Sequence, residues 1–151
     1  MIISFKQAKV FVKHFCLFFC ASTLERVCCF FFEKMEEKRM KTLGYYNGKF
    51  GELDEMSIPM NDRVCWFGDG VYDAGLSRNY KIFALNEHID RLFNSAGLLD
   101  IKVPVTKAEL ADLLQEMVNK MDTGNLFVYY QVTRGTGMRN HVFPEGKANL
   151  W

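Results

Sequence analysis

The clearest structural pattern in the sequence lies in residues 106–133, TKAELADLLQEMVNKMDTGNLFVYYQVT. Thr106 is followed three residues later by Glu109, a capping box that predicts a helix start. Apolar residues then recur at intervals of three and four, as on one buried face of a helix. These residues are Leu110, Leu113, Leu114, Met117, Val118 and Met121. Gly124 is typical of a helix end, and the β-branched and aromatic run 126–133 predicts a central strand.

A second helix is predicted on the N-terminal side of this one. Asn86 is a suitable N-cap, and the residues after it place apolar side chains on one helical face. They are Ile89, Leu92, Phe93, Ala96 and Leu99. Two hairpins come before this helix. The first joins strands 41–46 and 49–53 through Asn47-Gly48, where both turn residues need positive φ. The second joins strands 70–77 and 81–85.

Short extended pieces complete the pattern. Residues 56–59 form one, with Pro59 suited only to a sheet edge or a strand end, and residues 148–151 look like the beginning of another strand. Strands, two consecutive helices and strands again indicate an α+β domain in which both helices pack on one antiparallel sheet. A doubly wound nucleotide fold would instead alternate strand and helix.

Length and composition limit the classes of function. The 151 residues have room for one ordinary domain, and 49% hydrophobic with 25% charged residues is normal for a soluble globular protein. The formal net charge is +1, and no run of Lys and Arg alternates with aromatic residues. We therefore expect no nucleic-acid partner, no membrane partner and a cytoplasmic location.

The composition changes sharply near Met40. Residues 1–40 contain no Gly, Pro, Asp or Asn, but they hold 8 of the 14 Phe and 4 of the 5 Cys. We interpret residues 1–39 as a non-native extension from a wrongly assigned start, with translation beginning at Met40. Residues 36–39 fit this interpretation, because all four can be encoded by purine-only codons, as in a ribosome-binding site. The domain would then comprise residues 40–151.

Two other interpretations of residues 1–39 stay open. Lys6, Lys9 and Lys13 precede the apolar run 15–21, which is similar to a weak signal peptide or an anchor. The run is too short to span a bilayer, because Glu25-Arg26 follows well before roughly 20 apolar residues. The remaining interpretation is a real extension of the protein. The cysteines of this segment lack the paired spacing of a zinc site, so no metal site is predicted.

The segment Phe67–Tyr72 reads FGDGVY. Its two glycines do not form a dinucleotide fingerprint, because position 73 is Asp instead of Gly and a strand follows. We interpret Gly68-Asp69-Gly70 as a turn that needs two permissive residues. Tyr72 by itself would be an ordinary strand aromatic. Cys65, just before this segment, is expected to be a buried apolar residue.

Three side chains are candidates for binding anions. Arg91 lies at the edge of the apolar stripe of its helix, where a guanidinium could bind phosphate oxygens through its planar fork. The alternative is an ordinary solvated arginine. Arg139 and His141 stand on alternate residues after two glycines. In an extended segment they would point the same way and could clamp a carboxylate, although both types are also common in loops.

Together these segments resemble the N-terminal small domain of class IV pyridoxal-phosphate enzymes, most closely the D-amino acid aminotransferases. The matching segments are Asp62-Arg63, Phe67–Tyr72, Asn86–Leu92, Gln131–Thr136 and Arg139–His141. The resemblance implies that Arg91 holds the phosphate of pyridoxal 5'-phosphate. It also implies that Tyr72, Arg139 and His141 surround the substrate carboxylate, and we expect Arg91 and Tyr72 to border a shared cavity. Homodimers are implied as well, with the Arg139–His141 loop reaching the neighbouring subunit.

The resemblance ends before the larger C-terminal domain that carries the Schiff-base lysine. We therefore expect an incomplete small domain that contains no catalytic residue and is inactive alone, from a transaminase moving the amino group of a D-amino acid to a 2-oxo acid. Gly137-Met138 stands where the family has a more rigid, proline-containing pair, which leaves substrate preference open. The alternatives are a branched-chain aminotransferase, an aminodeoxychorismate lyase, or a non-catalytic dimerising module.

Overall fold

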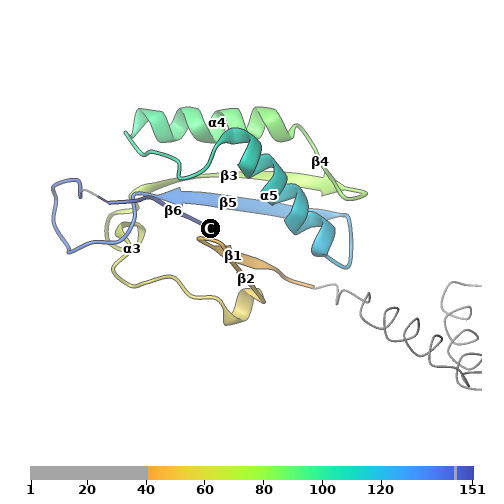
Figure 1. Ribbon diagram of the computed structural model, residues 1–151, viewed down its shortest axis with the longest axis horizontal. Helices are drawn as coiled ribbons and strands as arrows, with labels where there is room; N and C mark the ends of the chain where they lie inside the picture. The colour runs from red at the N-terminus through yellow and green to blue at the C-terminus, as the bar shows by residue number, and fades with distance from the viewer. Residues whose placement is uncertain (1–40, 145) are drawn as a thin grey trace, which may run out of the picture. The chain divides into compact units, whose positions relative to one another are not determined.

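In the computed structural model, which describes residues 41–144 and 146–151, a four-stranded antiparallel sheet has two helices on one face (Figure 1). The strand order is β4-β3-β5-β6. These strands span Lys81–Ile82 (β4), Gly70–Arg78 (β3), Leu126–Thr133 (β5) and Asn149–Leu150 (β6). β5 pairs along its length with β3 and at its end with β6, so the predicted central strand and the α+β class are confirmed. The interpretations of residues 1–39 lie outside the described residues.

A separate hairpin precedes this sheet. β1 (Gly44–Tyr46) and β2 (Lys49–Gly51) pair antiparallel around Asn47-Gly48. Asn47 has φ 44° and Gly48 has φ 92°, so the predicted turn is confirmed. Both strands are shorter than expected: β1 begins only at Gly44, and β2 ends at Gly51, just before a 3-10 turn, η1 (Leu53–Glu55). Residues 56–59 form no strand. The Pro59 carbonyl instead accepts the Asp62 N–H at 2.9 Å and turns the chain into a helix.

That helix, α3 (Arg63–Phe67), was not predicted. It is only 5 residues long, too short for an apolar repeat to show in the sequence. Its N-cap is Asp62, whose carboxylate accepts the Val64 N–H at 3.0 Å. Its C-cap is Gly68 in the left-handed region, with φ 62°. The predicted glycine turn therefore exists, but it ends a helix.

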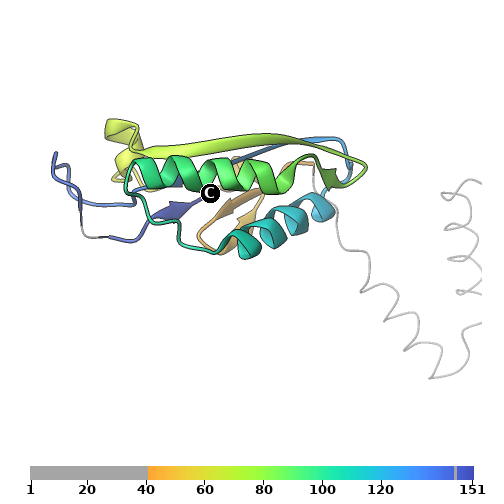
Figure 2. The same ribbon diagram turned by 90° about the horizontal axis from the view of Figure 1, so that it is seen from above.

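The two long helices are α4 (Leu85–Leu98) and α5 (Lys107–Lys120). α4 runs along β3, and α5 lies beside the β1–β2 hairpin (Figures 1 and 2). The capping box of α5 is present. The N-cap predicted for α4 is wrong, because the helix begins two residues earlier. Ala84 is the N-cap with φ 47°, and Asn86 lies exposed in the first turn. Leu99 is the C-cap of α4 and is exposed, so it does not extend the buried face.

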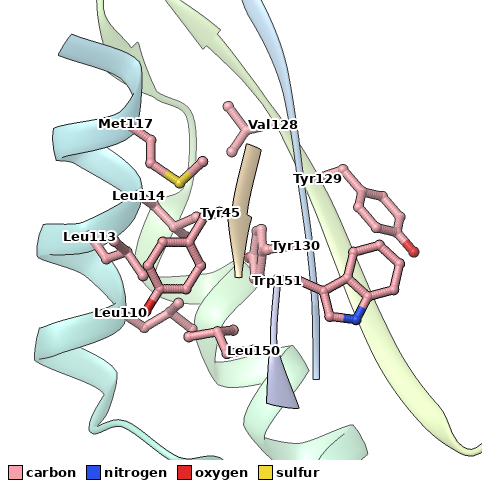
Figure 3. Close-up of a pocket in the computed structure, with 10 residues that line it drawn as sticks. All are labelled: Tyr45, Leu110, Leu113, Leu114, Met117, Val128, Tyr129, Tyr130, Leu150 and Trp151. Atoms are coloured by element: carbon pink, nitrogen blue, oxygen red, sulfur yellow. The ribbon is translucent and has the colours of Figure 1, made fainter. Parts of the chain in front are cut away.

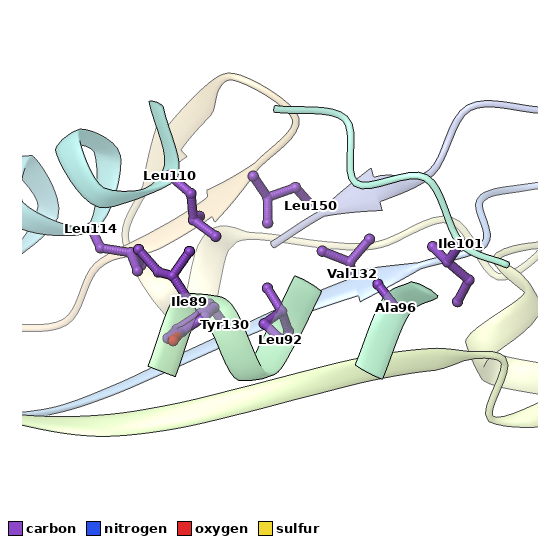
Figure 4. Close-up of a cluster of buried hydrophobic side chains, with 9 residues drawn as sticks. All are labelled: Ile89, Leu92, Ala96, Ile101, Leu110, Leu114, Tyr130, Val132 and Leu150. Atoms are coloured by element: carbon purple, nitrogen blue, oxygen red, sulfur yellow. The ribbon is translucent and has the colours of Figure 1, made fainter. Parts of the chain in front are cut away.

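The core lies between the helices and the sheet (Figure 4). α4 contributes Ile89, Leu92 and Ala96, and α5 contributes Leu110 and Leu114. They meet residues of β5 and β6 and of the connection between the helices, namely Tyr130, Val132, Leu150 and Ile101. Burying a side chain of this size stabilises the fold by about 1.5–3 kcal/mol. This packing fixes α4 over β3 and so determines which side chains of the two elements meet.

Candidate functional site

Arg91 projects from α4 onto Asp73 of β3. Its Nε donates to Asp73 Oδ2 at 2.6 Å, and its Nη2 donates to Asp73 Oδ1 at 2.7 Å. Such a bidentate pair fixes the plane of the guanidinium. The buried Asp73 carboxylate also lies 2.8 Å from His88 Nδ1 and accepts the Ala74 N–H at 2.7 Å. One strand carboxylate therefore orients two side chains that lie three residues apart on α4.

Hydrogen bonds within this cluster favour the charged forms of Asp73 and Arg91. Burial alone would raise the pKa of Asp73, but hydrogen bonds from Arg91 and His88 bring it below the usual range. The same carboxylate raises the pKa of Arg91. The Arg91 side chain is nevertheless 63% exposed, and its Nη1 makes no hydrogen bond to residues 41–144 or 146–151. One end of a fixed guanidinium thus stays available to an external anion.

Tyr72 lies on the opposite face of the sheet from Arg91. Neighbouring strand residues point to opposite faces, and Asp73 points to α4. Tyr72 instead stacks on Tyr129, with ring centroids 5.3 Å apart and planes 22° apart. Figure 3 shows Tyr129 and Trp151 together on the side of β5 away from the α5 leucines. Arg91 and Tyr72 therefore do not face the common cavity that was expected, within the residues that the structure describes.

Tyr72 lies beside an open strand edge of β3. The Leu76 carbonyl accepts the Phe83 N–H at 2.9 Å, on the side of β4. Because peptide groups alternate in direction along a strand, the N–H and C=O of Tyr72 face that same edge. β4 covers the edge only opposite Ser77 and Arg78. Within the described chain, the β3 edge around Tyr72 has no neighbouring strand.

Arg139 and His141 come together on Phe67, the last residue of α3. The Arg139 guanidinium carbon lies 5.5 Å from the centre of the Phe67 ring, and the His141 ring centroid lies 5.5 Å from it. Both side chains are exposed. The segment forms a loop with bends and not the extended strand assumed from the sequence. Packing on a shared aromatic ring, and not strand alternation, therefore brings the pair together.

A buried cluster of charged residues lies beneath this loop. The Asp69 carboxylate accepts from Arg63 Nε at 2.7 Å and from Arg134 Nε at 2.9 Å. Burial would raise the pKa of Asp69, but the hydrogen bonds from Arg134 and Arg63 lower it. Arg134 also lies 3.8 Å over the Phe143 ring. No role was predicted for these residues from the sequence, because nothing in their spacing shows that they meet.

Asp62 connects the loop to the sheet. It is fully buried, and its Oδ2 accepts from Thr133 Oγ1 at 2.9 Å and from Asn149 Nδ2 at 2.8 Å. The Asn149 Oδ1 in turn accepts from Asn47 Nδ2 at 2.9 Å. The two ends of the loop segment, at β5 and β6, are therefore held by one carboxylate. Asp62 belongs to a segment that was singled out in the sequence, but its contacts with residues up to 87 positions away were not predicted.

The remaining features of the described residues contribute little to a site. A cavity of about 30 Å³ between α5, the sheet and Tyr45 is lined mostly by apolar side chains (Figure 3). Among the described residues, no group of His, Cys, Asp and Glu could hold a metal ion, and no helix is long and apolar enough to cross a membrane. Cys65 is exposed, so its expected burial is wrong. It lies on the outer side of the short α3 helix, whose buried residue is Arg63.

Residues 70–150 match the family model of amino-transferase class IV. The chain belongs to the class IV aminotransferases. The matched segment contains all four predicted site residues, which are Tyr72, Arg91, Arg139 and His141. The charged anchors Arg63 and Asp69 lie immediately before it.

Curated relatives of this class IV aminotransferase include D-alanine aminotransferases. That of Listeria monocytogenes is 45% identical over 102 residues, which cover 66% of this chain and 35% of the relative. That of Bacillus licheniformis is 38% identical over 107 residues, covering 71% and 37%. The chain thus spans little more than a third of the length of the curated relatives it matches.

Solved structures with the same fold include branched-chain aminotransferases. The Escherichia coli enzyme has a TM-score of 0.67 and 16% identity, over 74% of this chain and 39% of that one. The enzyme of Thermoproteus uzoniensis, solved with norvaline, has a TM-score of 0.66 and 18% identity over the same shares. At these identities the likeness concerns the fold, and it places the described residues in the small domain of class IV aminotransferases.

Proposed function

We propose that these residues form the small domain of a pyridoxal-phosphate-dependent transaminase, which transfers the amino group of a D-amino acid to a 2-oxo acid. The observation that carries the proposal is the Asp73–Arg91 pair, which fixes an exposed guanidinium whose Nη1 makes no hydrogen bond to the described residues. The D-alanine aminotransferase names of the relatives support the substrate class.

The residues present fit the phosphate of this cofactor. Arg91 is charged, fixed by two hydrogen bonds and exposed at Nη1, which suits a phosphate oxygen better than a mobile side chain would. His88 lies beside it on the same carboxylate. The cofactor, when bound, supplies an electron sink for the charge that develops at the amino acid Cα. Arg91 would hold it at one end and so fix its orientation.

The substrate carboxylate would be held by Tyr72, Arg139 and His141. Tyr72 offers a hydroxyl from a ring stacked on Tyr129, and the pair on Phe67 offers one permanent cation and one imidazole. Holding the carboxylate fixes the direction of the Cα–H bond for proton transfer. Which hydrogen is exposed, and hence the preference for D-amino acids, would follow from that orientation.

Arg91 and Tyr72 lie on opposite faces of the sheet, so one bound complex would have to extend past the open edge of β3 to contact both. The family resemblance adds a homodimer in which the Arg139–His141 loop reaches the partner subunit. It also implies a Schiff-base lysine, and we propose that this lysine belongs to the larger C-terminal domain of the family. We therefore propose that the described residues alone bind ligands but do not turn them over.

Cofactor binding tests the phosphate role. Titration of the chain with pyridoxal 5'-phosphate, followed by tryptophan fluorescence, measures the affinity. Arg91→Lys keeps the charge but loses the fork bound to Asp73, and we expect its Kd to rise at least about tenfold. Arg78→Lys, on an exposed arginine at the end of β3, is the matched control and should bind like the wild type. Equal affinity of all three chains would show that Arg91 does not hold the phosphate.

A second titration separates the substrate alternatives. The cofactor-loaded chain is titrated with D-alanine and with L-leucine, and tighter binding of D-alanine is expected. Tighter binding of L-leucine would favour the branched-chain aminotransferase alternative, whose fold is the same. Binding of neither amino acid, together with unaltered cofactor binding in Arg91→Lys, would favour a non-catalytic module.

A further inference from the structure

We infer that Arg63 is the positioning residue for the Arg139–His141 pair, and that Phe67 is the surface on which both side chains rest. The inference depends on the proposed carboxylate role of that pair, which it deepens by naming what holds it. No motif in the sequence connects α3 with this loop. The connection is made by hydrogen bonds across 77 residues of chain.

Arg63 holds the backbone of the loop directly. Its Nη1 donates to the Asn140 carbonyl at 2.7 Å and to the Val142 carbonyl at 3.4 Å. Asn140 lies between Arg139 and His141, so the contact is at the centre of the pair. The Arg63 side chain is only 4% exposed, and water therefore competes little with these bonds. A buried charge fixes the peptide from which both exposed side chains project.

The same arginine also supports the ring beneath the pair. Its guanidinium carbon lies 4.7 Å from the centre of the Phe67 ring, the ring that Arg139 and His141 contact at 5.5 Å each. Two cations near one ring require that their repulsion be offset. Asp69 supplies the opposite charge, because it accepts from Arg63 Nε at 2.7 Å. The groups thus follow one another in the order Asp69 carboxylate, Arg63 guanidinium, Phe67 ring and the exposed Arg139–His141 pair.

Lysine could not replace Arg63 in this arrangement. The planar fork donates through Nε to a carboxylate and through Nη1 to a carbonyl at the same time. A lysine ammonium is a single point donor and cannot lie flat on Phe67 while it reaches both acceptors. The start of the loop is held by backbone bonds, because the Arg63 N–H donates to the Gly135 carbonyl at 3.0 Å and the Gly137 N–H donates to the Asn61 carbonyl at 3.1 Å. The Arg63 side chain holds the part of the loop that follows, at Asn140 and Val142.

Amide hydrogen exchange of the chain tests the anchor by itself. In Arg63→Lys we expect exchange of residues 138–142 to become at least about tenfold faster, with α5 unchanged. Ile89→Val, a truncation in the core under α4, is the control for a general loss of stability. It should not release the loop selectively. Arg63→Ala, rescued by millimolar guanidinium, is a second variant, and its loop exchange should return toward the wild-type rate.

Carboxylate binding tests the functional consequence. D-Alanine titrated into the cofactor-loaded chain should bind at least about tenfold more weakly to Arg63→Lys, while affinity for pyridoxal 5'-phosphate stays unchanged. A purely structural role would weaken both ligands alike. Faster loop exchange without any D-alanine binding by the wild type would leave the anchor intact and overturn the proposed function. Unchanged loop exchange in Arg63→Lys would overturn the anchor itself.

Discussion

At the scale of single residues, each charged cluster combines exposed side chains that could bind a ligand with buried side chains that hold them in place. Arg91, Arg139 and His141 could be selected from the sequence, because their types and their order resemble a known family. Their partners could not be selected. Asp73 orients Arg91 because β3 lies under α4, and Asp69 binds Arg63, which holds the loop. Such contacts depend on tertiary packing. Arg91 and Tyr72 do not share the expected cavity for a different reason, because strand alternation places Tyr72 and Asp73 on opposite faces of the sheet.

Asp69 provides a test of the buried anchors. Asp69→Asn leaves Arg63 and Arg134 without a counter-charge, so we expect a loss of about 3–5 kcal/mol in the free energy of unfolding at pH 7. The pKa of Asp69 is lowered in the folded chain. Its stabilisation is therefore complete above the unfolded pKa of about 3.9 and is lost as the pH falls through the folded value.

Urea unfolding between pH 7 and pH 2 measures both effects. The difference between the wild type and Asp69→Asn should narrow only below about pH 4. Asp112→Asn, on the exposed side of α5, is the control and should change stability by less than about 0.5 kcal/mol. A constant difference across the whole pH range would contradict the proposed ion-pair origin.

At the scale of elements, local signals predicted most of the fold. The capping box of α5, the Asn47-Gly48 turn and the long β5 strand are all confirmed, because each is determined by neighbours in sequence. α4 was found but its start was misplaced. Its N-cap, Ala84, lies in the left-handed region and makes no side-chain hydrogen bond, and nothing in the residue type indicates this. Short α3 gave no periodic signal at all.

Two glycines should respond in opposite ways to replacement by alanine. Gly97 lies within α4, and a Cβ there meets nothing within 4 Å. Gly97→Ala should therefore stabilise the chain by about 0.4–1 kcal/mol, chiefly by restricting the unfolded state. Gly135 has φ 102° and a Cβ would collide with the Lys147 carbonyl, so Gly135→Ala should destabilise by more than about 1 kcal/mol. Thermal melts of both variants measure the difference, and shifts of equal sign would contradict the assigned backbone conformations.

At the scale of the whole molecule, the two faces of the sheet differ in character. One face is covered by α4 and α5. The other carries exposed side chains along β3 and β5, with Tyr72 66%, Leu76 64% and Phe127 70% exposed. Leu76 and Phe127 are direct cross-strand partners, so the apolar area is continuous. Monomeric proteins seldom expose such patches without a function.

The exposed face of β3 and β5 should drive self-association of the chain. Leu76→Lys combined with Phe127→Glu replaces an exposed apolar pair by opposite charges in direct register, which antiparallel strands accommodate well. We expect sedimentation velocity to show concentration-dependent association in the wild type and much less in the double variant, with unchanged circular dichroism. Met60→Lys, on an exposed methionine that belongs to no strand of this sheet, is the matched control and should leave association as it was. Equal association of all three chains would mean that the exposed face of β3 and β5 does not drive self-association.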